Sequence, residues 1–280
     1  MSLSKKRLPL WFIMISILLL ISIYYLPLSS GSGVPVLNYH QINGEAHNVL
    51  TLSPQEFDAQ MAYLYKSGYT AISPKELVDH LQYGTILPEN PILITFDDGY
   101  EDNYRVAYPI LQKYHFTATF FIITDFAGNN DRYMTWKQIS EMYDKGFSFE
   151  SHTLSHLFLT NISNDDDILS QLIKSRESLE WHLKQKIEYL AYPGGMYDQH
   201  IIELAKQAGY RAAFTINLGR DAINCKLFTL NRIPIFAASH SFLRFWLRLN
   251  FTEIFMYLQN LKDSLTRLGA PKIASSIIIP

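Results

Sequence analysis

Cysteine is almost absent from the sequence, and neither sign of charge dominates it. Cys225 is the only cysteine in 280 residues, so an internal disulfide is excluded and we expect a buried thiol. The 24 Lys and Arg residues nearly balance the 26 Asp and Glu residues, which leaves a formal net charge of -2. Because such a balance creates no broad positive field, we expect no nucleic-acid partner.

Internal repeats and low-complexity tracts are also lacking, whereas apolar residues are plentiful. The sequence is 48% hydrophobic and 14% aromatic. A chain of this length and composition can bury one sizeable core and does not require two large domains. We therefore expect a single main domain.

The N-terminal segment has the composition of a membrane anchor. Lys5, Lys6 and Arg7 precede an unbroken apolar run from Leu8 to about Leu26, which is long enough to cross a bilayer. Basic residues stay on the cytoplasmic side, so a single-pass protein with an extracytoplasmic domain is expected. A retained anchor is favoured, although cleavage near its end would give a secreted protein. The expected segments are a cytoplasmic tail (1–7), a transmembrane anchor or uncleaved signal (8–27) and a flexible linker (28–33).

Between residues 34 and 238, strand patterns alternate with helical patterns. Ser53 and Ser73 each begin a Ser-Pro-x-Glu segment, which is typical of a helix start. The alternation predicts an α/β fold with a parallel sheet or barrel. Strands are predicted at 34–39, 91–96, 119–123, 147–150 and 187–191, and helices at 103–114, 135–145, 165–184 and 199–208.

Residues 239–280 are predicted to form a helical C-terminal extension. Apolar side chains are dense between Phe242 and Phe251, and Arg244 and Arg248 are four residues apart, on one helical face. Such a helix either packs on the domain as an ordinary amphipathic helix or lies in the interface of the membrane that holds the anchor.

Two adjacent carboxylates follow the apolar strand predicted at 91–96. Asp97 and Asp98 stand in the segment Thr-Phe-Asp-Asp-Gly-Tyr, and they can converge on one site only if the extended geometry breaks there. Gly99 supplies that freedom. Strand ends are where parallel α/β folds build their sites. An isolated Asp-Asp-Gly, however, is more often a polar turn.

Two histidines follow the strand predicted at 147–150. His152 and His156 stand in Ser-His-Thr-Leu-Ser-His, and their spacing can place both rings on one side of a helical turn, as in paired metal ligands. An isolated pair is weak evidence, but this pair and the Asp-Asp pair share one predicted rim. Two imidazoles and one carboxylate leave a coordination position open for water, which is typical of a hydrolytic zinc site.

Two further strand ends carry candidate functional residues. His40 follows the first strand, and Gly194 lies in a Pro-Gly turn after the strand at 187–191. Backbone N–H groups exposed in such a turn can face a ligand. Each feature alone is more often structural, as a satisfied turn histidine and a plain turn.

Together, these motifs resemble the polysaccharide deacetylase family, the carbohydrate esterases that share the NodB homology domain. The resemblance spans residues 34–238 and is most specific at the Asp-Asp and His-His motifs, with a Thr-Trp segment at 135–136 between them. The early Tyr-His pair at 39–40 is similar to the adhesin-type branch, which deacetylates poly-N-acetylglucosamine. The resemblance implies a distorted (β/α) barrel.

The resemblance also implies a role for each of five side chains. Asp98, His152 and His156 would hold one divalent metal ion, Asp97 would be the general base, and His40 would be the general acid. Zinc is the expected metal, although cobalt, nickel or iron would accept the same ligands.

One departure from the family pattern concerns residues 191–194. Much of the family has Arg-x-Pro-Tyr where this chain has Ala-Tyr-Pro-Gly, so the arginine that orients the base is missing there. We expect Arg232, after a further short strand, to replace it. The N–H group of Gly194 is the expected oxyanion donor. The candidate sugar contacts are Tyr100, Trp136 and Tyr192.

The implied function is metal-dependent N-deacetylation of a cell-surface N-acetylglucosamine polymer of the poly-β-1,6 type found in biofilms. The exopolysaccharide synthesis machinery is an expected partner. Peptidoglycan or chitin-like oligomers are alternative substrates, since the reacting acetamide is the same. A non-catalytic glycan-binding or assembly scaffold is an alternative of another class.

Overall fold

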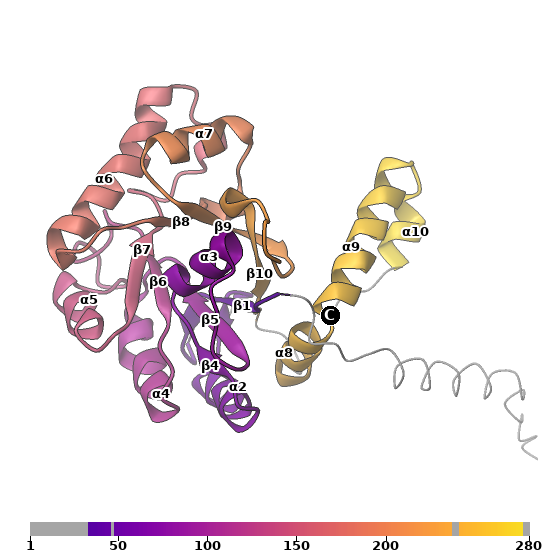
Figure 1. The fold of residues 1–280 in the computed structure, drawn as a ribbon, viewed down its shortest axis with the longest axis horizontal. Coiled ribbons are helices and arrows are strands. Elements are labelled where there is room, and N and C mark those ends of the chain that lie inside the picture. Colours follow the sequence, from indigo (N-terminus) through magenta and orange to yellow (C-terminus); the bar gives the residue numbers. More distant parts are fainter. Residues whose placement is uncertain (1–32, 46–47, 237–240, 277–280) are drawn as a thin grey trace, which may run out of the picture.

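The computed structural model describes residues 33–45, 48–236 and 241–276 (Figure 1). The predicted basic tail, the predicted anchor and all but the last residue of the linker lie outside these ranges. Within them, no helix combines the length and the apolar character that a membrane span requires.

Seven parallel strands close into a barrel. Neighbouring strands pair in the order β1-β10-β9-β8-β7-β6-β5, and β1 also pairs with β5, which closes the ring. The barrel is distorted, because β4 (Thr70–Ala71) pairs with the start of β5 whereas β1 pairs with its later part. The strands are β1 (Val36–Tyr39), β5 (Pro91–Phe96), β6 (Thr119–Ile122), β7 (Ser148–Ser151), β8 (Tyr189–Ala191), β9 (Ala212–Leu218) and β10 (Leu230–Pro234).

Helices surround the barrel, and α3 (Pro74–Tyr83) lies across one of its ends, where it packs on interior strand residues such as Leu93 and Phe121 (Figure 1). Ser53 and Ser73 cap the first two of them, each accepting a hydrogen bond from the backbone N–H of the glutamate three residues later, as the sequence predicts. The helix predicted at 103–114 begins with a π-helical turn, η1 (Asn103–Ala107). The helices are α2 (Pro54–Lys66), α3 (Pro74–Tyr83), α4 (Tyr108–Lys113), α5 (Trp136–Tyr143), α6 (Asp165–Leu183) and α7 (Gln199–Gln207).

A row of aromatic rings fixes which strand residues face the barrel interior. Tyr39, Phe96, Phe120 and Phe149 lie at matching register positions of β1, β5, β6 and β7, and their rings stack in succession. Phe57 of α2 packs edge-on against the first two rings, so the row faces outward. Because strand side chains alternate between faces, the residues next to these rings point inward.

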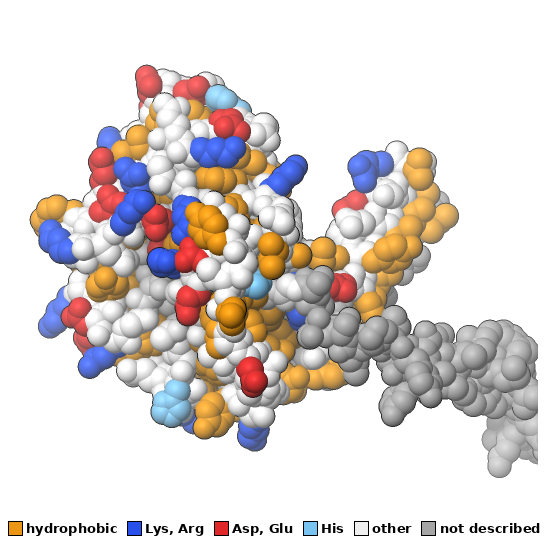
Figure 2. All heavy atoms as spheres, in the orientation of Figure 1, with side chains coloured by type: hydrophobic (Ala, Val, Ile, Leu, Met, Phe, Trp, Pro, Cys, Tyr) orange, Lys and Arg blue, Asp and Glu red, His pale blue; other side chains and the backbone are white. Residues whose placement is uncertain are grey.

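The C-terminal extension is helical, as predicted. It consists of α8 (Ser241–Asn250), α9 (Thr252–Arg267) and α10 (Pro271–Ser276). Phe245 and Leu249 of α8 are buried, and the ring of Tyr63 on α2 meets Phe245 edge-on. Thus α8 packs on the domain, as in the first of the two alternatives. By contrast, α9 and α10 project from the barrel and carry apolar side chains along one side (Figure 2).

The expectation of a buried thiol is wrong. Cys225 is half-buried and lies between β9 and the short 3-10 helix η4 (Leu227–Thr229). The partial burial raises the pKa of this thiol to about 11. The thiol is therefore protonated at neutral pH, which makes it a poor nucleophile.

Candidate metal centre and active site

Three of the predicted site residues converge at the carboxyl ends of the strands. Asp98 follows β5, while His152 and His156 lie in the loop after β7. One candidate ligand atom from each lies within 4.8 Å of the others. Both Nε2 atoms are 3.4 Å from Oδ1 of Asp98. This geometry places two imidazoles and one carboxylate around a common point.

Unusual backbone conformations produce this convergence. Asp98 and Gly99 both have positive φ, 74° and 81°, so the extended strand breaks at Asp98 itself. The positive φ favours glycine at position 99, where a Cβ would also lie 2.7 Å from Cδ1 of Ile122. The helical turn predicted for the histidines is wrong, because His156 follows an irregular loop and has a φ of 60°.

The donor set fits a divalent cation. Nδ1 of His152 lies 2.8 Å from the carbonyl oxygen of Ala191, an interaction that leaves Nε2 as the electron-pair donor. Oδ1 of Asp98 is buried and accepts no hydrogen bond within the protein. Burial lowers the pKa of His156 to about 4, so this imidazole is neutral, as a metal ligand must be.

The second carboxylate is held by an arginine from β10. The guanidinium nitrogens Nη1 and Nη2 of Arg232 each donate to one oxygen of Asp97 at 2.7 Å, and both side chains are buried. Burial alone would raise the pKa of Asp97, but the positive charge of Arg232 lowers it well below its usual range. The sequence places Arg232 beyond a strand. It lies within β10, with its side chain directed into the barrel.

His40, directly after β1, faces the same carboxylate. Its Nε2 atom lies 4.0 Å from Oδ2 of Asp97, and its side chain is 13% exposed. The side-chain amide of Asn103 donates to the carbonyl oxygen of His40 and fixes the backbone there. Burial lowers the pKa of this imidazole, while the carboxylate of Asp97 acts in the opposite direction. His40 and Asp97 are therefore placed to act on one reacting group.

Gly194 lies in the 3-10 turn η3 (Pro193–Gly195), which follows β8. It is exposed and has a φ of 60°. A Cβ at this position would lie 2.7 Å from the ring of Phe158, so the turn and that ring approach closely. The role of the Gly194 N–H group as an oxyanion donor stays a prediction.

Of the three predicted sugar contacts, Tyr100 is the one with suitable placement. It follows the Asp97-Asp98-Gly99 turn, is half-buried and stacks on Tyr133, with the ring centroids 5.1 Å apart. Burial, assisted by the neighbouring carboxylate of Asp98, raises the pKa of its hydroxyl group.

The other two predicted sugar contacts are engaged within the protein. Tyr192 is fully buried, with its hydroxyl group donating to the carbonyl oxygen of Phe228 and its ring stacked on Tyr197. One face of Trp136 is covered by His182, whose ring centroid is 3.6 Å away. Tyr192 therefore offers no solvent-facing ring to a sugar. In Trp136, the ring face that His182 covers is unavailable for such a contact.

Sequence reasoning missed Phe158. This ring is 45% exposed and lies against Gly194, two residues beyond His156. Its place directly after the histidine motif was the available signal. Aromatic faces at such positions suit the apolar face of a sugar.

The fold and the site together define a class of protein. A closed parallel α/β barrel carries its site at the carboxyl ends of its strands. Here that end holds two histidines and one aspartate, beside a second carboxylate and a third histidine. This combination is typical of a metal-assisted hydrolase.

Comparisons with known sequences identify the family. Residues 85–213 match the family model for polysaccharide deacetylases. The Bacillus subtilis protein YxkH, which is named as a polysaccharide deacetylase, is 34% identical over 202 residues, 72% of this chain and 71% of its own. A poly-β-1,6-N-acetyl-D-glucosamine N-deacetylase of Staphylococcus aureus is 31% identical over 66% of this chain and 68% of its own. The chain belongs to the polysaccharide deacetylase family, whose members are hydrolases of carbon–nitrogen bonds.

Solved structures agree with this assignment. The Streptococcus pyogenes deacetylase PplD, determined in complex with acetate, is 32% identical and superimposes with a TM-score of 0.69, covering 73% of this chain and 92% of that protein. IcaB from Ammonifex degensii is 26% identical, with a TM-score of 0.71 over 79% of this chain and 98% of its own. The deacetylase barrel implied by the motifs is thus confirmed.

Proposed function

We propose that this enzyme removes acetyl groups from N-acetylglucosamine residues of a poly-β-1,6-linked exopolysaccharide in a metal-dependent reaction. The supporting observation is the convergence of Asp98, His152 and His156 beside the Asp97–Arg232 pair and His40. The substrate choice rests on the 31% identity with the S. aureus poly-β-1,6-N-acetyl-D-glucosamine N-deacetylase.

In this proposal, Asp98, His152 and His156 hold the divalent ion. Two imidazoles and one carboxylate suit zinc, and cobalt, nickel and iron accept the same donors. When bound, the ion supplies Lewis-acid polarisation of the acetyl carbonyl group.

Asp97 acts as the general base. It accepts a proton from the water molecule that attacks the acetyl carbon, and the two hydrogen bonds from Arg232 orient its oxygens for this transfer. The same arginine keeps Asp97 ionised across the working pH range, since it lowers the pKa of the carboxyl group. The N–H group of Gly194 is our candidate donor to the carbonyl oxygen as negative charge develops there.

His40 acts as the general acid. In its protonated form it donates a proton to the sugar nitrogen while the bond between that nitrogen and the acetyl carbon breaks. Without this proton the leaving group would be an amine anion. The products are acetate and a free amino sugar, so the neutral polymer becomes partly cationic.

The test measures acetate release by the purified full chain from poly-β-1,6-N-acetylglucosamine and, separately, from peptidoglycan, with and without a chelator. We expect release from the first polymer, its loss with chelator and its recovery on adding zinc. A His152→Ala variant should be inactive, whereas the matched His200→Ala change, at an exposed histidine paired with Asp165, should leave release intact. Activity confined to peptidoglycan would refute the substrate, and chelator-resistant release would refute the metal dependence.

We further propose that the catalytic domain acts outside the cytoplasm at the cell membrane, beside the polymer synthesis machinery. Support comes from the sequence of residues 1–27, where basic residues precede an apolar run. Fractionation of cells that express the full chain, followed by protease treatment of intact cells, tests this proposal. Recovery of the protein in the cytosol would contradict it.

A further inference from the structure

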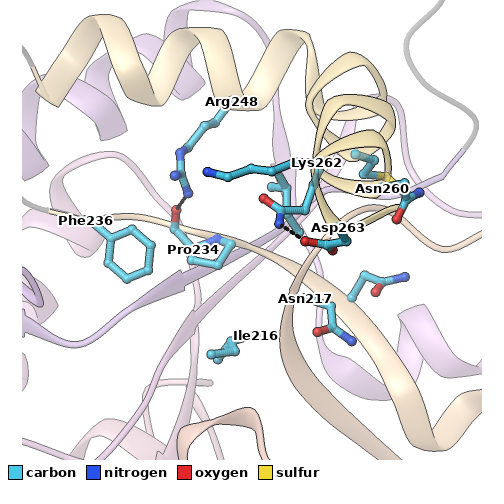
Figure 3. A pocket seen from close by; sticks show the side chains of 12 residues that line it. Ile216, Asn217, Pro234, Phe236, Arg248, Asn260, Lys262 and Asp263 are labelled. Carbon is cyan, nitrogen blue, oxygen red and sulfur yellow. Dashed lines mark hydrogen bonds between the residues drawn. The ribbon is translucent and has the colours of Figure 1, made fainter. Parts of the chain in front are cut away.

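A polar cavity lies between the barrel and the C-terminal extension. Its volume is about 750 Å³, and its walls come from β9, β10 and the residues just after it, α8 and α9 (Figure 3). Pockets of this size are large enough to take a small ligand or part of a polymer. The cavity is separate from the metal centre, and neither Asp98 nor either metal-site histidine lines it.

Strand register places this cavity on the same rim as the active site. Pro234, in the wall, pairs with Asn38, two residues before His40, and Asn38 in turn pairs with Thr95, two residues before Asp97. Because Phe236 lies two residues beyond Pro234, the chain after β10 runs toward the same end of the barrel as His40 and Asp97.

A second neighbour links the cavity to the η3 turn. Ile216, another wall residue, packs so closely on Gly195 that a Cβ there would lie 2.9 Å from its backbone nitrogen. Gly195 directly follows the candidate oxyanion donor, Gly194. The cavity is thus next to the η3 turn of the active site, on the side of the barrel that faces α9.

The lining has the chemistry of a carbohydrate site. Phe236 is 37% exposed, and the guanidinium of Arg248 lies 5.3 Å from its ring centroid. Aromatic faces accept the apolar face of a sugar ring, while amide and charged side chains bond to its hydroxyl groups. Asn217, Asn260, Lys262 and Asp263 supply such groups, and Figure 3 shows them around the same space as Phe236.

We propose that this cavity is a remote subsite that binds an N-acetylhexosamine residue of the same polymer chain whose acetyl group is being hydrolysed. The inference rests on the proposed function and extends it. Every lining residue lies beyond residue 213, where the match to the family model ends. The C-terminal helices thereby become part of the substrate-binding surface, and chain length becomes a determinant of turnover.

The first test compares kcat/KM for a dimer and a hexamer of β-1,6-linked N-acetylglucosamine. We expect the wild type to prefer the hexamer, and Phe236→Ala or Asn260→Ala to lower the hexamer-to-dimer ratio about tenfold, chiefly through KM. Tyr257→Ala is the matched control, because this exposed aromatic residue is on α9 but does not line the cavity. An unchanged ratio in folded variants, or no preference in the wild type, would overturn the subsite.

A second test separates the subsite from the proposed reaction. Hexamer binding is measured by calorimetry on the Asp97→Asn protein, with and without Phe236→Ala. Weaker binding on loss of the ring would support the subsite even if no acetate were released by the wild type, in which case only the proposed reaction fails. Equal binding by both proteins would overturn the subsite whatever the activity.

Discussion

Arg232 carries a formal positive charge in the middle of the barrel and is nevertheless fully buried. Its donors are used by three partners: both oxygens of Asp97, the carbonyl oxygen of Thr215 and the hydroxyl oxygen of Thr95. Removing one partner from a buried pair of this kind leaves an uncompensated charge in a medium of low polarity. The pair therefore couples the orientation of the base to the stability of the domain.

This coupling predicts the behaviour of Arg232 variants. Arg232→Ala should lose about 3–5 kcal/mol of unfolding free energy and more than tenfold in kcat. Arg232→Lys should lose less stability, but it cannot donate two parallel hydrogen bonds, so its kcat should also fall. Denaturant titration and acetate release measure the two effects. Arg211→Ala, which removes a half-buried arginine paired with Asp79, is the control. Undiminished turnover in Arg232→Ala would refute the orienting role.

A second residue-scale prediction concerns pH. Burial raises the pKa of Asp221 to about 6 from the usual 3.8, against the hydrogen bonds that it accepts from Asn231. A carboxyl group with a raised pKa in the folded state favours folding when protonated, and this contribution is lost as pH rises through 6. The difference of about 2 pKa units corresponds to about 3 kcal/mol.

The measurement is the unfolding free energy between pH 4 and pH 7.5 for the wild type and Asp221→Asn. The amide that replaces the Asp221 carboxyl group cannot ionise. The unfolding free energy of the wild type should therefore fall relative to that of the variant as pH rises. Asp131→Asn, at an exposed position, is the reference for surface charge changes. A difference between wild type and variant that stays constant across the range would show that burial does not shift this group.

At the scale of elements, α8 is the helix that attaches the extension to the barrel. Phe245 and Leu249 are buried, and Arg248 donates to the carbonyl oxygen of Pro234 at the end of β10. Arg220 donates to the carbonyl oxygen of Leu249. These contacts hold the base of α9, so the cavity beside β10 depends on them.

Two phenylalanines on α8 make a matched pair for testing this attachment. Phe245→Ala should destabilise the protein by about 3–5 kcal/mol because it empties a buried site. Phe242→Ala, at a ring that is 40% exposed and meets the same Tyr63, should cost less than about 1 kcal/mol. Denaturant titration measures the loss of unfolding free energy for each variant. Amide hydrogen exchange shows whether α8 opens before the barrel does. Equal effects of the two changes would contradict the packing described here.

At the scale of the whole molecule, a metal ion that joins the β5 and β7 loops should stabilise the folded chain. Zinc at about a thousand times its dissociation constant should add about 4 kcal/mol to the unfolding free energy of chelator-treated protein. Asp98→Asn should abolish most of this gain, whereas His200→Ala should retain it. Denaturation midpoints with and without zinc provide the measurement. An equal gain in Asp98→Asn would locate the binding elsewhere.

Much of this architecture was predictable because its signals are local. Strand patterns at 91–96, 119–123 and 147–150 and the Ser-Pro helix starts depend on neighbouring residues, and all have counterparts in the structure. The family and its deacetylase chemistry followed from short motifs at strand ends and are confirmed. By contrast, β9 was not predicted, because its apolar pattern is short and ends in an exposed segment.

The candidate site is likewise divided between residues that the sequence predicts and features that depend on packing between distant segments. The sequence by itself determined which side chains stand at the strand ends, since Asp97, Asp98 and His152 come directly after strands that any parallel α/β fold would align, and His156 lies in the loop that follows. The sequence suggested Arg232 as the partner of Asp97, but only the tertiary structure decided that this side chain reaches a carboxylate 135 residues away, because β1 pairs with both β5 and β10 and closes the ring. Closure also decided that Tyr192 is buried and that a cavity opens beside α9, since packing between distant segments leaves no mark in local sequence.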